Sequence, residues 1–209
     1  MLSPVLPFKT LLFVSMIAAG PAFAREPGTA ARWASLPPDK ATVRAGAPTL
    51  APFAHVVFCK SYPAECRTDG RGSGPVRLTA ELKALLNEVN LRVNRSIRPV
   101  AEGSGPLDDV WLLSPEGGDC DDYAVTKRRE LARAGLPVSA LQLRVVQTPA
   151  GEGHAVLAVR TDRGDMILDN LTGRILEWSD TRLTLVKFQS ATDPRRWFRP
   201  HGNTVASID

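Results

Sequence analysis

Two segments with a helical pattern come first in this chain, and four strand-like runs follow them. Residues 78–96 place apolar side chains at helical spacing behind a candidate cap at Thr79. Residues 119–134 form a second such segment, with Asp119 as its candidate cap and Gly135 as its stop signal. The strand-like runs are 141–145, 155–159, 166–168 and 183–188. Helices that precede a set of strands indicate an α+β fold, with the helices packed on an antiparallel β-sheet.

Residues 1–24 have the pattern of a secretory signal peptide. Lys9 supplies the positive charge, residues 11–19 the apolar core, and Ala22-Phe23-Ala24 the small-x-small cleavage site. An uncleaved N-terminal anchor is the alternative, but the apolar run is too short to span a bilayer. No later segment has about eighteen consecutive apolar residues. We therefore expect a periplasmic or secreted protein that does not span the membrane after signal cleavage.

The rest of the chain is short enough for one domain. Residues 25–52, rich in Pro, Ala and Gly, are expected to form an extended lead-in. Residues 53–200 are expected to form the domain, with a loop in the Gly-rich part of 53–75, and residues 201–209 a C-terminal tail. The formal net charge is only +4 and aromatic residues make up only 6% of the chain, so nothing favours a nucleic acid partner.

The chain has three cysteines, Cys59, Cys66 and Cys120. An odd number outside the cytoplasm indicates one disulfide and one free thiol, or an intermolecular bridge. Cys59 and Cys66 flank a short segment with a turn at Pro63, and they can form a disulfide in an oxidising compartment. Such a bond would contribute about 2–3 kcal/mol, and two reduced buried thiols are the alternative. Cys120 is then the spare thiol.

Cys120 stands at the start of the second predicted helix. The free N–H groups and the positive dipole end of a helix N-terminus favour a thiolate and can stabilise an oxyanion on a substrate carbonyl. Gly117-Gly118, just before it, would let backbone and substrate approach closely. The alternative is a small buried apolar residue without chemistry. On the same helix, Lys127-Arg128-Arg129 is expected to form a solvated face.

A nucleophilic cysteine needs a base, and the base needs a group that orients it. His154 lies at the start of one predicted strand and Asp169 at the end of the next. If residues 161–164 form a four-residue hairpin loop, Arg160 pairs with Asp165 and His154 becomes a diagonal neighbour of Asp169, within side-chain reach. A two-residue turn at Arg163-Gly164 would instead leave them four residues apart, too distant for contact. Taken singly, a surface histidine and a simple turn after a strand are the alternatives.

Three segments resemble motifs of the bacterial transglutaminase-like cysteine peptidases. The first is Gly118-Asp119-Cys120-Asp121-Asp122-Tyr123-Ala124, with Lys127 a turn later. The second and third are His154-Ala155-Val156-Leu157 and Leu168-Asp169-Asn170, which are similar to that family in order and spacing. The resemblance implies a papain-like, transglutaminase-like fold. It also implies Cys120 as nucleophile, His154 as general base and acid, and Asp169 as the orienting carboxylate.

The resemblance extends upstream to Phe58-Cys59, Glu65-Cys66 and Trp111. Well-studied members of the family are periplasmic and calcium-dependent, and they cut a large surface adhesin near its N-terminus, which releases it from the outer membrane. The resemblance therefore implies a protein substrate of that kind, with a membrane-bound regulator as a second partner. The chain departs from the family at Asp121, where members often have Glu. It also has no Gln between the signal peptide and Cys120 to serve in an oxyanion hole.

Acidic residues crowd the candidate nucleophile. Asp119, Asp121 and Asp122 would raise the pKa of the Cys120 thiol and oppose thiolate formation. A bound cation would cancel that effect, and Ca²⁺ takes hard oxygen ligands such as these. We therefore expect Asp119 and Asp121 to help bind Ca²⁺. The alternative is that these acids only complement the helix dipole.

Three functions are compatible with these residues. The first is an exported cysteine peptidase that cleaves a protein through a Cys-His-Asp triad and an acyl-enzyme intermediate. The same acyl chemistry with an amine acceptor would make a transglutaminase or an amidase. The third, from a different class, is a calcium-binding envelope interaction module that has the fold without catalysis.

Overall fold

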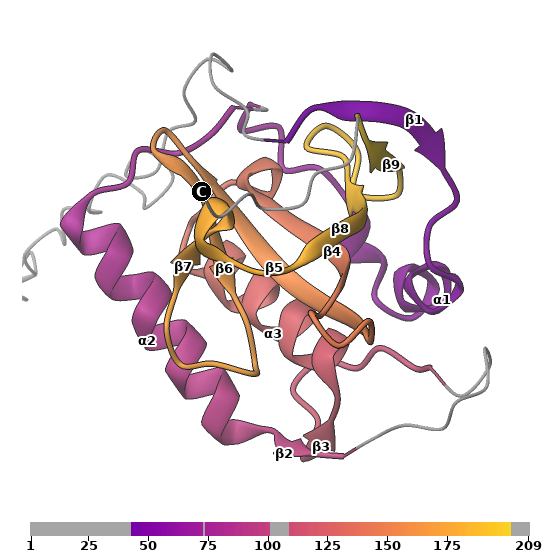
Figure 1. Cartoon of the computed structure of the whole chain (residues 1–209), viewed down its shortest axis with the longest axis horizontal. Helices are drawn as coiled ribbons and strands as arrows, with labels where there is room; N and C mark the ends of the chain where they lie inside the picture. Colours follow the sequence, from indigo (N-terminus) through magenta and orange to yellow (C-terminus); the bar gives the residue numbers. More distant parts are fainter. Residues whose placement is uncertain (1–42, 73, 101–108, 202–209) are drawn as a thin grey trace, which may run out of the picture.

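The computed structural model describes residues 43–72, 74–100 and 109–201. Within them, three α-helices pack on a seven-stranded antiparallel sheet (Figure 1). The strands, in spatial order, are β1 (Ala45–Thr49), β9 (Trp197–Pro200), β8 (Thr184–Gln189), β4 (Leu141–Gln147), β5 (Gly153–Thr161), β6 (Gly164–Leu168) and β7 (Leu176–Glu177). A short parallel pair joins β2 (Arg98–Pro99) to β3 (Gly117–Gly118). The fold is α+β, as the sequence predicts.

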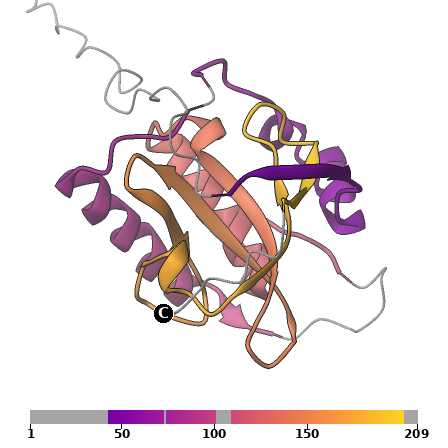
Figure 2. The same ribbon diagram turned by 45° about the horizontal axis from the view of Figure 1, so that its top comes forward.

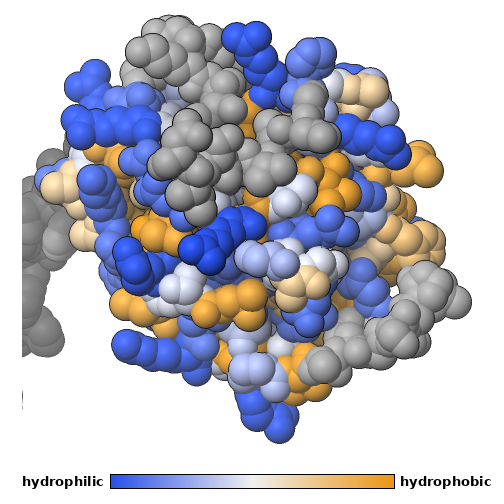
Figure 3. Space-filling model, viewed as in Figure 1, coloured by the Kyte–Doolittle hydropathy of each residue, from blue (hydrophilic) through white to orange (hydrophobic). Residues whose placement is uncertain are grey.

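Part of the predicted domain plan falls outside these residues. The predicted signal peptide 1–24, residues 25–42 of the predicted lead-in and the tail from residue 202 all lie outside the described residues. Among the residues that the structure describes, none of the helices has the length and apolar character needed to cross a bilayer. On the face seen in Figure 3, apolar residues are scattered between polar ones.

The four predicted strands lie in β4, β5, β6 and β8, whose ends differ from the predictions by a few residues. β5 is apolar along its middle because it is buried on both faces, with Leu157 and Val159 in one core and Val156 and Ala158 in the other. The sequence does not predict β1, β7 and β9. All three are short, and β1 and β7 form the edges of the sheet, where few apolar contacts mark a strand.

The β5–β6 hairpin has the predicted register with a tighter turn. Arg160 pairs with Asp165, as expected, but Thr161 also pairs with Gly164. The expected four-residue loop is therefore a two-residue turn at 162–163. Gly164 has φ 116°, a left-handed conformation that glycine adopts without strain. This conformation lets the β5–β6 ladder continue for one more residue pair before the turn.

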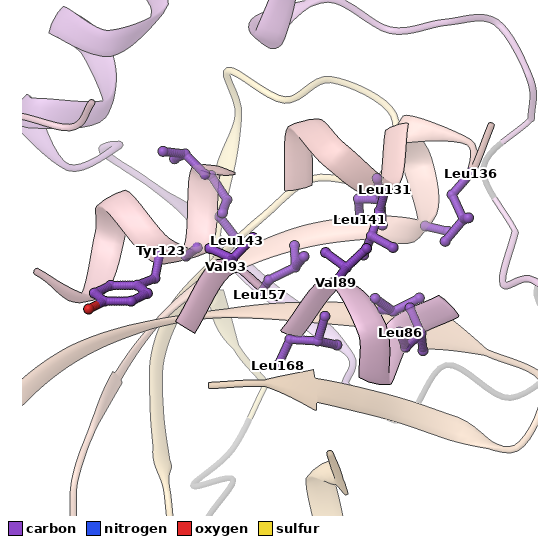
Figure 4. Close-up of a cluster of buried hydrophobic side chains, with 14 of the residues drawn as sticks. Leu86, Val89, Val93, Tyr123, Leu131, Leu136, Leu141, Leu143, Leu157 and Leu168 are labelled. Carbon is purple, nitrogen blue, oxygen red and sulfur yellow. The ribbon is translucent and has the colours of Figure 1, made fainter. Parts of the chain in front are cut away.

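Two long helices, α2 (Ala80–Ser96) and α3 (Cys120–Arg133), begin and end near the predicted residues. The Thr79 side chain caps α2 by accepting a hydrogen bond from the Leu82 N–H. α3 packs against β4 and β5, and α2 lies beside α3. Figure 4 shows the core where these elements meet. Its labelled side chains are Leu86, Val89, Val93, Tyr123, Leu131, Leu136, Leu141, Leu143, Leu157 and Leu168.

A third helix, α1 (Phe53–Ser61), is not predicted from the sequence. It begins after Pro52 without a side-chain cap, and its apolar residues Phe53 and Val56 are exposed, so it lacks both signals of a helix. A short 3-10 turn, η2 (Pro63–Cys66), follows it, and a disulfide joins Cys59 to Cys66 with their Cα atoms 5.5 Å apart. In both ribbon views α1 and α2 lie near opposite edges of the sheet (Figures 1 and 2).

The expected solvated face at Lys127-Arg128-Arg129 is wrong. Lys127 is 0% exposed and Arg128 only 3%. Arg128 donates hydrogen bonds to the carbonyl oxygens of Glu65 and Leu141, and Arg129 pairs with the Glu65 carboxylate at 3.3 Å. Partners in η2 and β4 therefore hold Arg128 inside the fold and Arg129 partly inside it, and the local sequence of α3 gives no sign of such partners.

Candidate active site

Cys120 is the first residue of α3, and it is partly exposed. Asp119, the cap residue, and Asp122, the third helical residue, form a capping box. The fully buried Asp122 carboxylate accepts hydrogen bonds from the backbone N–H of Asp119 at 3.2 Å and of Leu112 at 2.6 Å. Asp122 therefore ties the segment before the helix to the helix start, and so fixes the position of Cys120.

Gly118 makes this arrangement possible. A Cβ atom at this position would lie 2.0 Å from Oδ2 of Asp122, far inside van der Waals contact. The carboxylate sits where a side chain of residue 118 would be, so the glycine before the cap serves the packing of Asp122.

Groups around the Cys120 thiol shift its pKa in opposite directions. Burial raises its pKa to about 12, and the charges of Asp121 and Asp119 act in the same direction. The backbone N–H groups of Ala155 and of Cys120 itself point at the sulfur and oppose the shift. In the metal-free protein the acidic neighbours therefore favour a protonated thiol.

His154 and Asp169 are in direct contact, as the hairpin register predicts. Nε2 of His154, near the start of β5, lies 2.8 Å from Oδ1 of Asp169, which follows β6, and both side chains are nearly buried. The same carboxylate oxygen accepts from the N–H of Leu171 at 2.9 Å. Burial would raise the pKa of Asp169, but the hydrogen bond from His154, the charge of the ring, the Leu171 N–H and Lys127 together lower it. The ionised Asp169 carboxylate thus binds Nε2 of His154, and Nδ1 is the ring nitrogen that this carboxylate does not hold.

The thiol and this pair lie at one end of β5. Ala155, whose N–H points at the sulfur of Cys120, directly follows His154 in the strand. The start of α3, the start of β5 and the end of β6 therefore bring together three side chains that are far apart in the sequence. Thiol, imidazole and carboxylate in this order are the groups that nucleophilic acyl transfer needs.

The acids beside Cys120 form a potential cation site. One ligand atom each from Asp119, Cys120 and Asp121 lies within 4.8 Å of the others. Oδ1 of Asp119 and Oδ2 of Asp121 are buried without a hydrogen-bond partner among the described residues. Burial raises the pKa of Asp121 to about 10, and a hydrogen bond with Asp119 and the charges of Asp119, Asp109 and Asp122 add to the rise. Two adjacent carboxyl groups, each with a buried oxygen that lacks a hydrogen-bond partner among the described residues, fit a hard cation such as Ca²⁺.

Sequence reasoning missed two groups that hold the site in place. The first is the role of Asp122 in the capping box, for which the D-x-x-D pattern from Asp119 is a visible signal. The second is Asn94 of α2, whose Nδ2 donates to the carbonyl oxygens of Asp169 at 3.0 Å and Thr172 at 3.2 Å. Asn94 follows the apolar stripe of α2, and no sequence pattern indicates what it contacts.

A cavity of about 360 Å³ opens beside Asp169. Its apolar lining residues include Ile167, Leu171, Leu176 and Leu183, and two arginines, Arg174 and Arg182, also line it. The described residues that line this cavity include neither Cys120 nor His154. It can accommodate an apolar side chain next to the carboxylate of the pair.

Comparisons with known proteins were made for the whole chain. The model of a family described as bacterial transglutaminase-like cysteine proteinase, BTLCP, matches residues 45–204. No curated protein matches the chain in sequence. Among solved structures, Legionella pneumophila LapG is similar at 27% identity and a TM-score of 0.43, over 53% of this chain but only 64% of that one, less than two thirds of its length. The calcium-bound form of Legionella pneumophila LapG is similar at 21% identity and a TM-score of 0.48, over 71% of this chain and 91% of that one.

Proposed function

Because the chain belongs to the bacterial transglutaminase-like cysteine proteinases, we propose that it is an exported peptidase that cleaves a protein with Cys120, His154 and Asp169. Family membership makes it a cysteine peptidase. The observation that supports the assignment of residues is the 2.8 Å contact between His154 and Asp169 at the end of β5 where the Ala155 N–H points at the Cys120 thiol.

Each residue has a distinct role in the proposed reaction. Nδ1 of His154 takes the proton of the thiol, and Sγ of Cys120 attacks the scissile carbonyl carbon. The backbone N–H groups at the start of α3 stabilise the oxyanion. His154 then gives its proton to the leaving amine and activates the water that hydrolyses the thioester. Asp169 keeps the proton on Nε2, so that Nδ1 faces the thiol, and it stabilises the imidazolium.

Calcium fits the acids beside the nucleophile. Asp119 and Asp121 would hold the ion through their buried carboxylate oxygens, because Ca²⁺ prefers oxygen to sulfur ligands. A cation there would offset the charge of both carboxylates and so favour the thiolate of Cys120.

The compartment and the substrate follow from the sequence. The signal pattern of residues 1–24 supports a mature protein in the periplasm or outside the cell. The family resemblance supports a large surface adhesin as substrate and a membrane-bound regulator as partner. Edman sequencing of the exported protein should then begin at Arg25.

The alkylation rate of Cys120 with iodoacetamide tests the triad. We would measure it near neutral pH, with Cys59 and Cys66 oxidised, with calcium and with chelator. The wild type in calcium should react at least about tenfold faster than His154→Ala, because the imidazole supplies the base. An equal rate in the two proteins would reject the triad and favour a binding module without catalysis.

Hydrolysis and amine transfer are separated by a second measurement. An extract of envelope proteins would be incubated with the wild type or with Cys120→Ala, with and without a fluorescent amine. New protein N-termini that appear only with the wild type would support a peptidase and identify its substrate. Incorporation of the amine without new N-termini would instead identify a transglutaminase.

A further inference from the structure

Lys127 is a buried basic residue of α3. Its side chain is 0% exposed, and Nζ has no hydrogen-bond partner among the described residues. Nζ lies over the ring of Tyr123, 5.8 Å from its centroid. Burial lowers the pKa of Lys127 to about 7, while the charge of Asp169 acts against that shift. Such a group costs stability, because an ammonium leaves water without gaining hydrogen bonds.

The neighbouring cation of α3 behaves differently. Arg128 is just as buried, but its guanidinium donates to the carbonyl oxygens of Glu65 at 2.8 Å and of Leu141 at 3.3 Å. Arg128 therefore links α3 to η2 and β4 and contributes to the structure. Lys127 makes no such link, so its presence needs a reason other than stability.

Contacts between α2 and α3 place Lys127 along the helix pair. The Tyr123 hydroxyl donates to the Ile97 carbonyl at 2.7 Å, and Arg92 pairs with Glu130 at 2.7 Å. The later residue of α3 contacts the earlier residue of α2, so the two helices are antiparallel. Lys127 lies between these two contacts, level with Asn94.

Asn94 connects this level of the helix pair to the catalytic acid. Its Nδ2 donates to the Asp169 carbonyl oxygen at 3.0 Å, and its Oδ1 is buried without a partner among the described residues. A buried donor on Lys127 and a buried acceptor on Asn94, both without a hydrogen-bond partner among the described residues, thus lie at the same level of the helix pair. The charges of Lys127 and Asp169 act on each other in both directions.

We propose that Lys127 is a positioning residue for Asp169: its buried amino group, level with Asn94, supplies in its protonated form the positive charge that keeps this carboxylate ionised and oriented toward His154. The proposal rests on the proposed triad, because it acts through Asp169. The lysine is then retained at a cost in stability for the benefit of the reaction.

A single substitution distinguishes a positioning role of Lys127 from a structural role. Lys127→Met keeps the length of the side chain and removes the charge. We expect its Tm to rise by several degrees, because the buried ammonium is gone, while Cys120 alkylation falls at least about fivefold in calcium near neutral pH. Arg128→Met is the matched control, with a lower Tm and an unchanged alkylation rate at a temperature where it is folded. A lower Tm for Lys127→Met, or an unchanged alkylation rate, would overturn the proposal.

A double-mutant cycle tests whether Lys127 acts through Asp169. Alkylation rates would be compared for wild type, Lys127→Met, Asp169→Asn and the double variant. We expect Lys127→Met to have no further effect once Asp169 is Asn. Independent, multiplicative losses would contradict positioning through Asp169. If Asp169→Asn alone has no effect, the triad itself fails; if it slows alkylation and Lys127→Met does not, only the role of Lys127 fails.

Discussion

Cys120 occupies a position with two opposite effects on its proton. The helix N-terminus and the Ala155 N–H favour the thiolate, whereas burial and the acids on either side raise the pKa to about 12. These acids are adjacent to Cys120 in the chain, so their effect cannot be relieved by a rotation of the helix. A nucleophile built this way depends on whatever neutralises Asp119 and Asp121.

At Gly118 a single methyl group should disrupt the helix start. Gly118→Ala would place Cβ 2.0 Å from Oδ2 of Asp122, so the capping carboxylate must move. We expect a loss of about 1–3 kcal/mol in the free energy of unfolding, as for overpacked sites. Urea denaturation measures it. Gly153→Ala is the control, since nothing lies within 4 Å of its Cβ, and it should change stability by less than about 0.5 kcal/mol. Equal losses in both variants would contradict this account.

His55 should make the fold sensitive to acid. It is 1% exposed, Trp197 Nε1 donates to its Nδ1 at 3.4 Å, and burial together with Arg128 lowers its pKa from 6.5 to about 4. Above pH 6.5 the ring is neutral in both folded and unfolded chains. As the pH falls toward 4, the unfolded chain takes up a proton that the folded one excludes, so stability is lost.

Denaturation curves of His55→Gln against pH isolate this contribution. Between pH 6.5 and 4 the wild type should lose up to about 3 kcal/mol more than His55→Gln. The exposed His201 serves as control, and His201→Gln should follow the wild type. Parallel curves for wild type and His55→Gln would show that His55 is not the acid-sensitive group.

At the level of elements, the sequence predicts what local signals determine. α2 and α3 have caps and an apolar period, and the central strands alternate or are wholly apolar, so all of them are predicted within a few residues. α1 is not predicted, because only Ala54, His55 and Phe58 are buried and no side chain caps it. The burial of Arg128 depends on partners in η2 and β4, which are remote in the sequence.

The same distinction applies to the candidate site. The meeting of His154 with Asp169 could be predicted from the assumed pairing of Arg160 with Asp165, because this register makes the two residues diagonal neighbours. The roles of Asn94 and Lys127 could not, because each depends on how two helices pack beside the turn after β6. The groups that hold the site in place are therefore less visible in the sequence than the groups that would react.

The disulfide should hold α1 and η2 together. We expect the double variant Cys59→Ala, Cys66→Ala to lose about 2–3 kcal/mol in the free energy of unfolding, because the unfolded chain gains freedom. Its loss would also loosen η2, where the Glu65 carbonyl accepts from Arg128 at 2.8 Å. Urea denaturation with and without reductant measures the effect. Reductant should destabilise the wild type and Cys120→Ser alike and leave the double variant unchanged; any other pattern contradicts the assignment.

Over the whole molecule, the site collects residues from two helices and from two neighbouring strands of the sheet. α2 supplies Asn94, α3 supplies Cys120, and the ends of β5 and β6 supply His154 and Asp169. Both long helices and the centre of the sheet must be in place before these groups meet. Stability and reactivity should therefore be coupled at the start of α3, where repelling carboxylates destabilise the metal-free fold.

Calcium should stabilise the folded protein as a whole. A ligand that binds only the folded state at about 100 times its Kd adds about 2.7 kcal/mol, which corresponds to a rise in Tm of about 5–10 °C for a chain of this size. Thermal melting in calcium and in chelator measures the shift. Asp121→Asn should melt above the wild type in chelator, because burial and neighbouring acids raise the pKa of Asp121 to about 10, and its Tm should respond little to calcium. Asp119→Asn, which retains a capping side chain, should also lose the calcium response. If calcium and chelator leave the Tm of the wild type unchanged, the two carboxylates are not a calcium site, and their repulsion is simply a cost of the helix start.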